Sequence, residues 1–247
     1  MARHSYAKVQ KPSDAMPSRI GTLAEKSLHA ALKDWYARPG DLLECRVEGY
    51  FIDILRPSPD PETPPRCIEI QTRHLGAMKP KLSALLDRYP IQVVHPISYE
   101  RHIIRIDADG EIRSRRKSPK RGTMYHLFPE LVSLPVLLSH PNLTLEVALI
   151  RDEEVWVDDG KGSWRRKRWS IHDRRLLEVK ETRLLTAISD YAALLPTTLP
   201  DQFDSQELAK AIGQPRPLAQ KMAYCLREMG ILQIASKRGR SHLYSRT

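Results

Sequence analysis

Two acidic residues lie inside short apolar segments, where carboxylates are uncommon. Asp53 follows Ile52 in the segment FIDIL, and sixteen residues later Glu69 stands between Ile68 and Ile70. A carboxylate in the middle of an apolar strand is costly unless it is paired or bound to a metal ion. Two such carboxylates on adjacent strands would repel each other unless a divalent cation bridges them. These residues therefore predict a divalent-cation site.

Gln71 extends this constellation, because residues two apart on a strand point to the same face as each other. Glu69 and Gln71 are thus expected to share one face. Mg²⁺ prefers one or two carboxylates together with waters and phosphate oxygens of a substrate. A metal ion held in this way can activate water and stabilise the charge of a phosphodiester under attack. The expected cofactor is Mg²⁺ or Mn²⁺.

Each of the three residues also has a purely structural interpretation. Asp53 could be a charge on an edge strand, and Gln71 could be a plain polar strand residue. Glu69 could form a salt bridge with Arg73 or Arg46.

The elements that must position these residues follow from hydrophobic periodicity and turn signals. A helix is expected over 22–36, and two strands joined by a tight turn at Gly49 over 43–55. Residues 56–66 contain five prolines and must be a loop. The remaining expected elements are a strand at 67–71, a helix at 80–88, strands at 91–97, 103–106 and 144–157, a basic loop at 114–122, and an amphipathic helix at 175–195.

This element order and the acidic residues resemble the PD-(D/E)xK nuclease superfamily. That family has an α-β-β-β-α-β core, in which an acid on the second strand and a (D/E)-x-K on the third bind the metal ion. A Glu on the first helix often assists. Asp53 matches the first acid, Glu69-Ile70-Gln71 matches (D/E)-x-K, and Glu25 matches the helical Glu. The resemblance covers roughly residues 20–100.

The resemblance implies an α/β fold with a restriction-endonuclease-like mixed sheet flanked by helices. It implies that Glu25, Asp53 and Glu69 hold the metal ion and that Gln71 positions the attacking water. Gln stands where the family has Lys and cannot supply its charge. Lys79 or Lys81, at the start of the next helix, could reach the site as a substitute.

Glu25 also has a structural interpretation. It stands three residues after Thr22, so it can close a capping box. It shares a helix face with Leu28 and Leu32, which favours an inward role.

The last part of the chain has the pattern of a winged helix. Asp204 and Glu207 form a capping box before one helix, and a second helix is expected over 217–229. A hairpin with the basic tip KRGR follows. The expected organisation is a flexible arm at 1–19, a nuclease-like domain with a basic β extension at 20–180, and a winged helix-turn-helix domain at 181–247.

Basic residues gather in three places and suggest a nucleic-acid partner. The chain has 40 Lys and Arg against 30 Asp and Glu, a formal net charge of +10. The candidate phosphate-binding residues are Arg115, Arg116, Lys117, Lys120, Arg121, Arg165, Arg166, Lys167, Arg168, Lys221, Lys237, Arg238 and Arg240. A solvated, soluble face is the structural alternative.

Other features of the sequence bear on the cellular location of the protein. No apolar run is long enough to span a membrane, and the N-terminus lacks the apolar core of a secretory signal. The three cysteines form no C-x-x-C pair, which favours a reducing, cytoplasmic location over a disulfide framework.

These observations favour a divalent-metal-dependent endonuclease that acts on double-stranded DNA, in restriction of foreign DNA or in repair. The alternative is a catalytically inactive nuclease-like DNA-binding protein, acting as a regulator or as the targeting subunit of a complex. An RNA nuclease is a third possibility. The winged helix could also mediate a homodimer or bind a partner protein.

Overall fold

The structure, a computed structural model, describes residues 23–107, 109–162, 164 and 169–247. The expected N-terminal arm at 1–19 lies outside these residues.

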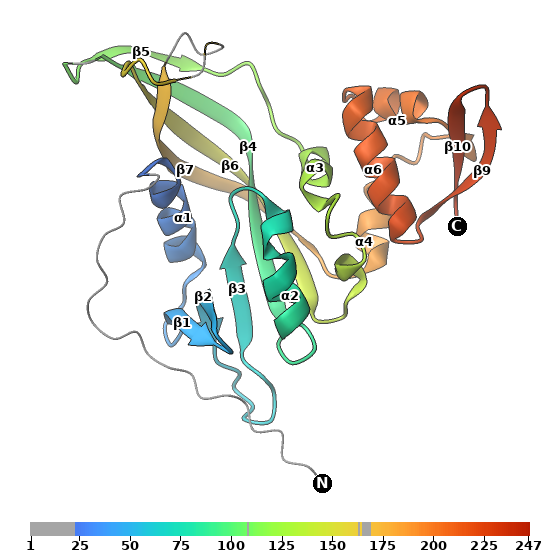
Figure 1. The fold of residues 1–247 in the computed structure, drawn as a ribbon, viewed down its shortest axis with the longest axis horizontal. Helices are drawn as coiled ribbons and strands as arrows, with labels where there is room; N and C mark the ends of the chain where they lie inside the picture. The colour runs from blue at the N-terminus through green and yellow to red at the C-terminus, as the bar shows by residue number, and fades with distance from the viewer. Residues whose placement is uncertain (1–22, 108, 163, 165–168) are drawn as a thin grey trace.

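A seven-stranded mixed sheet forms the centre of the molecule (Figure 1). Its strands are β1 (Leu42–Val47), β2 (Tyr50–Arg56), β3 (Arg66–Ile70), β4 (Ile91–Ile106), β5 (Ile112–Lys117), β6 (Leu143–Val157) and β7 (Ser170–Leu185). The order along the sheet is β1-β2-β3-β4-β6-β7, and β5 pairs with the distal half of β4. Strand β4 runs parallel to both β3 and β6, whereas the other neighbours are antiparallel. The chain is therefore an α/β protein, as predicted.

Helices cover both faces of this sheet because its central strands are apolar on both sides. Helix α1 (Leu23–Tyr36) packs Leu28 and Leu32 on one face. The other face is covered by α2 (Lys79–Leu85), α3 (Phe128–Leu131) and the 3₁₀ helices η1 (Leu75–Met78), η2 (Met124–Leu127) and η3 (Leu137–Ser139). None of the helices in the described part of the chain is long and apolar enough to cross a bilayer.

The first six major elements are α1, β1, β2, β3, α2 and β4, in the order that the sequence predicts. The hairpin between β1 and β2 turns at Glu48 and Gly49, whose φ angles are 48° and 88°. Two successive positive φ angles are typical of the tight turns that join antiparallel strands. The proline-rich segment connects β2 to β3 without regular structure, also as predicted.

The C-terminal part is a small helix-and-hairpin unit. It comprises α4 (Ile188–Ala192), β8 (Gln202–Phe203), α5 (Ser205–Ala211), α6 (Arg216–Glu228), β9 (Leu232–Arg238) and β10 (Ser241–Arg246), with strand order β8-β10-β9. Asp204 accepts hydrogen bonds from the N–H groups of Gln206 and Glu207, and Glu207 accepts one from the N–H of Asp204. The predicted capping box is confirmed.

Two element predictions are wrong. Residues 175–195 do not form one amphipathic helix, because β7 runs from Ser170 to Leu185 and pairs with β6 over its whole length. The basic segment at 114–122 is not entirely a loop, because its first four residues belong to β5 and pair with β4. Strand β7 also continues through the expected domain boundary at residue 180.

Candidate active site

Asp53 and Glu69 come together where β2 and β3 separate. The antiparallel register of these strands ends at the pair Ile54–Ile68, and the two acids are the next residues beyond that pair. Glu69 is buried, with 5% of its surface exposed, and Asp53 is partly buried. The charge of Asp53 contributes to the raised pKa of Glu69. The structure therefore places the two predicted acids in one site.

Asp53 is held as a carboxylate by two partners. The backbone N–H of Ile70 donates to its Oδ2 at 2.8 Å, and His29 Nε2 lies 3.2 Å from the same oxygen. Burial acts to raise the pKa of Asp53, but the hydrogen bond and charge of His29, with the Ile70 N–H, bring it below the usual range. The hydrogen bond to Asp53 raises the pKa of His29 in turn. Each of the two side chains therefore favours the charged form of the other.

Glu69 has a different environment. Lys81 Nζ donates to its Oε2 at 2.8 Å and to the carbonyl oxygen of Phe51 at 2.7 Å. Burial raises the pKa of Glu69 to about 7, in spite of the Lys81 charge and with a further contribution from Asp53. Its other oxygen, Oε1, is buried and has no hydrogen-bond partner within the described residues. A buried oxygen without a partner is a position at which a cation or a water is expected.

A small hard cation fits these two acids. Mg²⁺ typically takes one or two carboxylates and keeps several waters, and Asp53 and Glu69 are two carboxylates that already have His29 and Lys81 as partners. The described residues contain no group of three or more His, Cys, Asp or Glu side chains that could hold a metal ion. Glu25 lies in the first turns of α1, and its side chain lies outside the described residues.

The side-chain amide of Gln71 bonds to the backbone that follows it. Gln71 lies just beyond the end of β3, and its side-chain amide donates to the carbonyl oxygens of Arg73 at 2.5 Å and His74 at 3.5 Å. The amide therefore holds the turn that leads toward α2. The cation beside Glu69 is Lys81, one of the two lysines that the sequence suggested as substitutes.

His29 is the site residue that the sequence reasoning missed. It stands one helical turn after Glu25 on α1, so the two share a helix face. That spacing was the available signal, because the same face carries Leu28 and Leu32 into the core.

The basic residues of β5 and the segment after it fall into two groups. Arg115 Nε lies 3.0 Å from Glu153 Oε2, and Lys117 pairs with Glu100. Three further cations are exposed and form no ion pair within the described part of the chain: Arg116, Lys120 and Arg121. The predicted second cluster, Arg165, Arg166, Lys167 and Arg168, lies outside the described residues.

The basic residues of the C-terminal unit divide in the same way. Arg238 pairs with Asp204 at 2.9 Å and with Glu207 at 3.0 Å, so it ties the hairpin to the start of α5. Lys221 on α6 is exposed, as are Lys237 and Arg240 near the tip of the hairpin. None of these three forms an ion pair with another described residue.

Comparison with known proteins places most of this site within one family model. Residues 26–186 match the family described as "Domain of unknown function (DUF8091)". An uncharacterized protein of Treponema pallidum (strain Nichols) is 35% identical over 225 residues, which cover 91% of this chain and 86% of the relative. No solved structure matches the chain. The matched segment includes His29, Asp53, Glu69 and Lys81.

Proposed function

The chain belongs to the DUF8091 family, and we propose that it is a divalent-metal-dependent endonuclease that hydrolyses phosphodiester bonds in DNA. The observation that carries this proposal is the meeting of Asp53 and Glu69 at the point where β2 and β3 separate, with Lys81 beside Glu69. Two carboxylates and one ammonium group within a partly buried site suit metal-assisted hydrolysis of a phosphodiester. Restriction of foreign DNA and repair are both compatible roles.

The arrangement of elements supports a restriction-endonuclease-like core. The order α1-β1-β2-β3-α2-β4 is that of the PD-(D/E)xK superfamily, with Asp53 on the second strand and Glu69 on the third. The C-terminal unit supports a winged helix, since α5 and α6 are followed by the β9–β10 hairpin. In this proposal α6 is the helix that contacts DNA and the hairpin is the wing.

Each residue of the site then has a role. Asp53 and Glu69 hold the metal ion, with Glu25 as a further ligand in the pattern of the family. The bound metal ion supplies Lewis-acid stabilisation and lowers the pKa of a water. Lys81 holds a positive charge 2.8 Å from Glu69, where it can stabilise charge on the phosphate or orient a water. His29 orients the carboxylate of Asp53.

A second candidate function is a nuclease-like protein that binds DNA without cleaving it. It is favoured by the hydrogen bonds of Gln71, whose amide is used by the turn backbone and not by the acids. It is also favoured by the cations that already accompany the two carboxylates, His29 and Lys81. In that case the acids and cations stabilise the fold, and the basic residues carry the function.

Cleavage of plasmid DNA and calorimetric titration with Mn²⁺ test the proposal together. Asp53→Asn and Glu69→Gln keep the shape of each side chain and remove its charge, so each is expected to abolish Mn²⁺ binding and cleavage while the protein stays folded. Asp34→Asn, an exposed acid on α1, is the matched control and should behave as the wild type.

The results separate the two candidates. Mn²⁺ affinity that is unchanged in both variants removes the metal site from the proposal. DNA binding without detectable cleavage by the wild type, in the presence of Mn²⁺, assigns the chain to the binding function. A single-stranded RNA substrate in a parallel reaction distinguishes RNA from DNA.

A further inference from the structure

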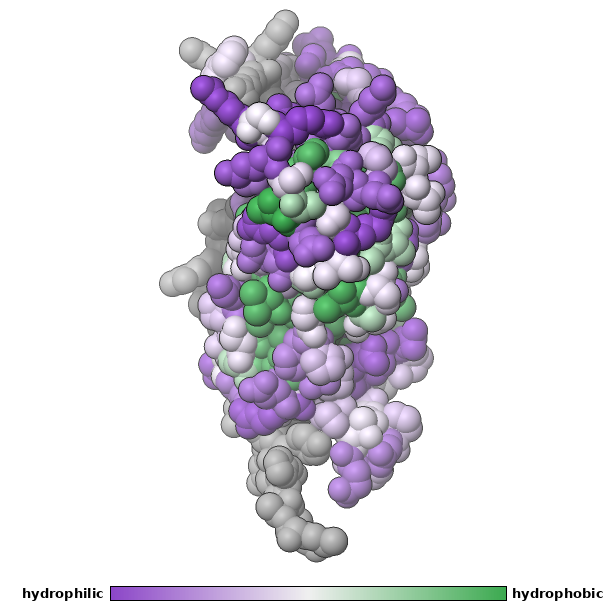
Figure 2. All heavy atoms as spheres, turned by 90° about the vertical axis from the view of Figure 1, so that its right-hand side faces the viewer, coloured by the Kyte–Doolittle hydropathy of each residue, from purple (hydrophilic) through white to green (hydrophobic). Residues whose placement is uncertain are grey.

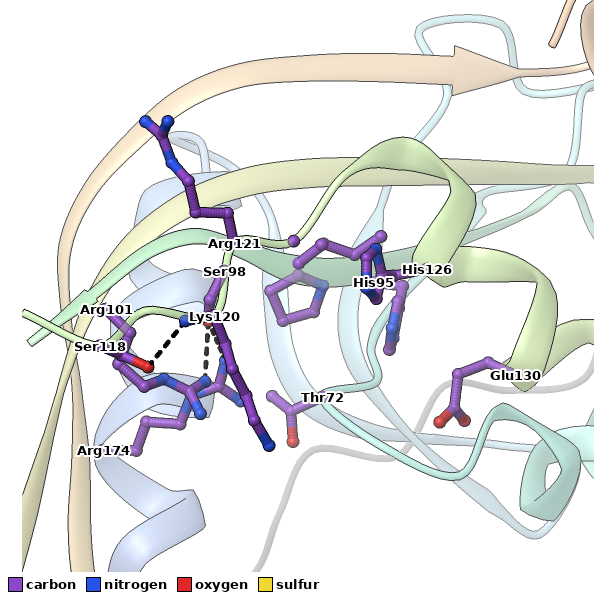
Figure 3. Close-up of a pocket in the computed structure, with 13 residues that line it drawn as sticks. Thr72, His95, Ser98, Arg101, Ser118, Lys120, Arg121, His126, Glu130 and Arg174 are labelled. Carbon is purple, nitrogen blue, oxygen red and sulfur yellow. Dashed lines mark hydrogen bonds between the residues drawn. The ribbon is translucent and has the colours of Figure 1, made fainter. Parts of the chain in front are cut away.

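A cavity of about 290 Å³ lies beside β4 (Figure 3). We name it the β4 pocket; its lining includes Thr72, His95, Ser98, Lys120, Glu130 and Arg174. Neither acid of the candidate active site lines it. Thr72 nevertheless follows Glu69 by three residues, so the Cα atoms of the two are at most about 10 Å apart.

One end of the pocket rests on a buried ion-pair cluster. Asp152 on β6 is fully buried and accepts hydrogen bonds from Arg101 and Arg174, and Arg101 also pairs with Glu154 at 2.5 Å. The two guanidinium groups are therefore fixed by partners beneath the pocket. Arg174 is itself buried, with 7% of its surface exposed, yet it lines the cavity.

The hydroxyl groups of Ser98 and Ser118 at this end of the pocket can still donate a hydrogen bond to a ligand. Ser98 Oγ accepts from Arg101 Nη2 at 2.7 Å and from Arg174 Nη2 at 2.8 Å, so its own hydrogen remains available. Ser118 Oγ accepts from the backbone N–H of Lys120 at 3.3 Å and keeps its hydrogen in the same way. The wall is thus rich in donors, and these donors suit an anion.

Lys120 adds a charge that the protein does not balance. It forms no ion pair with any described residue, and Figure 3 shows its side chain beside Arg101 and Arg174, directed toward Thr72. Arg121 extends away from this group in the same view. Asp152 and Glu154 offset Arg101 and Arg174. The remaining cations of the lining, Lys120 and Arg121, outnumber its one acid, Glu130, so the lining carries an excess of positive charge.

Gly122 keeps the Lys120 segment close to β4. Its N–H donates to the carbonyl oxygen of Ser98 at 2.7 Å. A Cβ atom at this position would lie 2.5 Å from both Ile97 Cγ2 and that carbonyl oxygen. Only glycine allows this approach without displacement of the backbone, so the pocket depends on a specific local fit.

We propose that the β4 pocket binds a phosphomonoester, carried either by a free nucleotide or by the end of a nucleic-acid strand. A phosphomonoester carries a charge of about −1.5 to −2 and three acceptor oxygens, which match the donors of Ser98, Lys120 and Arg174. The volume is at the lower end of the range of about 300–1,000 Å³ for small-molecule sites, which suits one nucleotide and excludes a duplex.

The strand-end form rests on the proposed function, because it requires a nucleic-acid substrate. Thr72 lines the pocket and is only three residues from Glu69. At about 3.4 Å of rise per nucleotide, the phosphate at the strand end would then lie about three nucleotides or fewer from the two acids. His95, His126 and Glu130 line the opposite end and leave room there for the sugar or base.

Calorimetric titration of the full chain in EDTA tests the proposal without a metal ion. The probes are adenosine monophosphate and one short single-stranded oligonucleotide with a phosphate or a hydroxyl at its 5′ or 3′ end. Lys120→Ala is expected to weaken phosphate-dependent binding about tenfold, and Lys120→Arg to retain most of it. Lys210→Ala, an exposed cation on α5 outside the pocket, is the matched control and should leave the affinity unchanged.

The outcomes identify the source of the phosphate. Tight binding of the free nucleotide supports the first form, and binding of the oligonucleotide that depends on its terminal phosphate supports the second. Equal affinities for all the oligonucleotides, with no binding of the nucleotide, overturn the proposal, as do equal losses in Lys120→Ala and Lys210→Ala. Glu69→Gln should leave pocket binding unchanged, because Glu69 does not line the pocket. If the wild type binds the phosphate probe in EDTA but neither binds Mn²⁺ nor cleaves DNA, only the proposed function has failed.

Discussion

Glu69 depends on a nearby cation because β3 buries it between two apolar neighbours. Burial raises its pKa to about 7, and one of its oxygens has no hydrogen-bond partner within the described residues. Lys81 reaches it from α2 and also binds the carbonyl oxygen of Phe51, so the ammonium group links β2 to β3. A lysine in this position can serve the fold, the reaction or both, and the two roles are separable by experiment.

Lys81→Ala is expected to reduce DNA cleavage by about 10²-fold or more while Mn²⁺ affinity stays the same or increases. The loss follows from removing a charged group beside the reacting phosphate, and the retained affinity follows because both carboxylates remain. Lys79→Ala, an exposed residue at the start of α2, is the control. Cleavage rates at saturating Mn²⁺, with calorimetry for the metal ion, provide the measurement.

Gln71→Lys sharpens this comparison, because it restores the lysine of the (D/E)-x-K pattern. If Lys81 is the functional cation, a second lysine at position 71 should recover part of the activity lost in Lys81→Ala. Full activity in Lys81→Ala alone would instead reduce Lys81 to a counter-ion of Glu69.

The sequence could identify some of these residues but not their partners. Asp53 and Glu69 were visible because a carboxylate in an apolar strand is costly wherever the strand packs. His29 and Lys81 were harder to assign, because their partners depend on how α1 and α2 pack on the sheet. The face expected for Gln71 did not reveal that its amide bonds to the carbonyl oxygens of Arg73 and His74.

The same contrast holds for whole elements. The first half of the sheet was predictable because its strands are short, apolar and bounded by turn residues. Strand β7 was not, because half of its residues are exposed and its leucines and valine fit a helical period equally well. Its conformation is decided by pairing with β6, in which Asp152 and Glu154 need the arginines of neighbouring strands. Because these ion pairs join residues that are far apart in the chain, no local sequence pattern can reveal them.

Asp152→Asn tests how much this inter-strand cluster stabilises the sheet. Asp152 is fully buried between Arg101 and Arg174, so the substitution leaves two buried cations poorly compensated. The expected loss in the free energy of unfolding at neutral pH is about 3–5 kcal/mol, typical for breaking a buried ion pair. Urea unfolding measures it, with the exposed Asp201→Asn as a control that should change little.

The pH dependence of this loss has a definite sign. Burial acts to raise the pKa of Asp152, but its hydrogen bonds and ion pairs with the two arginines lower it below the ordinary carboxyl value. Its contribution is therefore present above the unfolded-state pKa of about 3.9 and is lost as the pH falls through the lower folded-state pKa. The difference between wild type and Asp152→Asn should shrink in acid. A constant difference down to that range would contradict the ionised state assigned to Asp152.

At the scale of the whole molecule, the C-terminal unit is not separate from the sheet. One hydrophobic cluster contains residues of α2, α3, β6, α5 and α6, and Cys225 Sγ on α6 lies 3.8 Å from the carbonyl oxygen of Phe128. In Figure 1, α3 stands between the sheet and α6. Removal of residues 196–247 would expose this core, so substitutions of exposed cations test the winged-helix proposal more cleanly than truncation.

Some of the basic residues on the surface form ion pairs with acidic residues of the same chain, and others do not. Figure 2 shows that the side of the molecule to the right in Figure 1 is largely hydrophilic, with small hydrophobic areas between the polar side chains. The formal net charge is +10, yet several basic residues, such as Lys117 and Arg238, are paired with acids. The cations without such partners among the described residues are the ones expected to release counterions from DNA.

The salt dependence of duplex DNA binding tests this distribution. Arg116→Ala and Arg121→Ala should each lower the magnitude of the log–log salt slope by about 0.9 if the residue contacts one phosphate. The double variant Lys117→Ala with Glu100→Gln removes an ion pair and leaves the net charge unchanged, so its slope should equal that of the wild type. Binding isotherms at several salt concentrations, on duplexes of different sequence, give the slopes. If the salt slope of the double variant changes as much as that of Arg116→Ala, ion pairing within the protein does not determine which cations contact DNA.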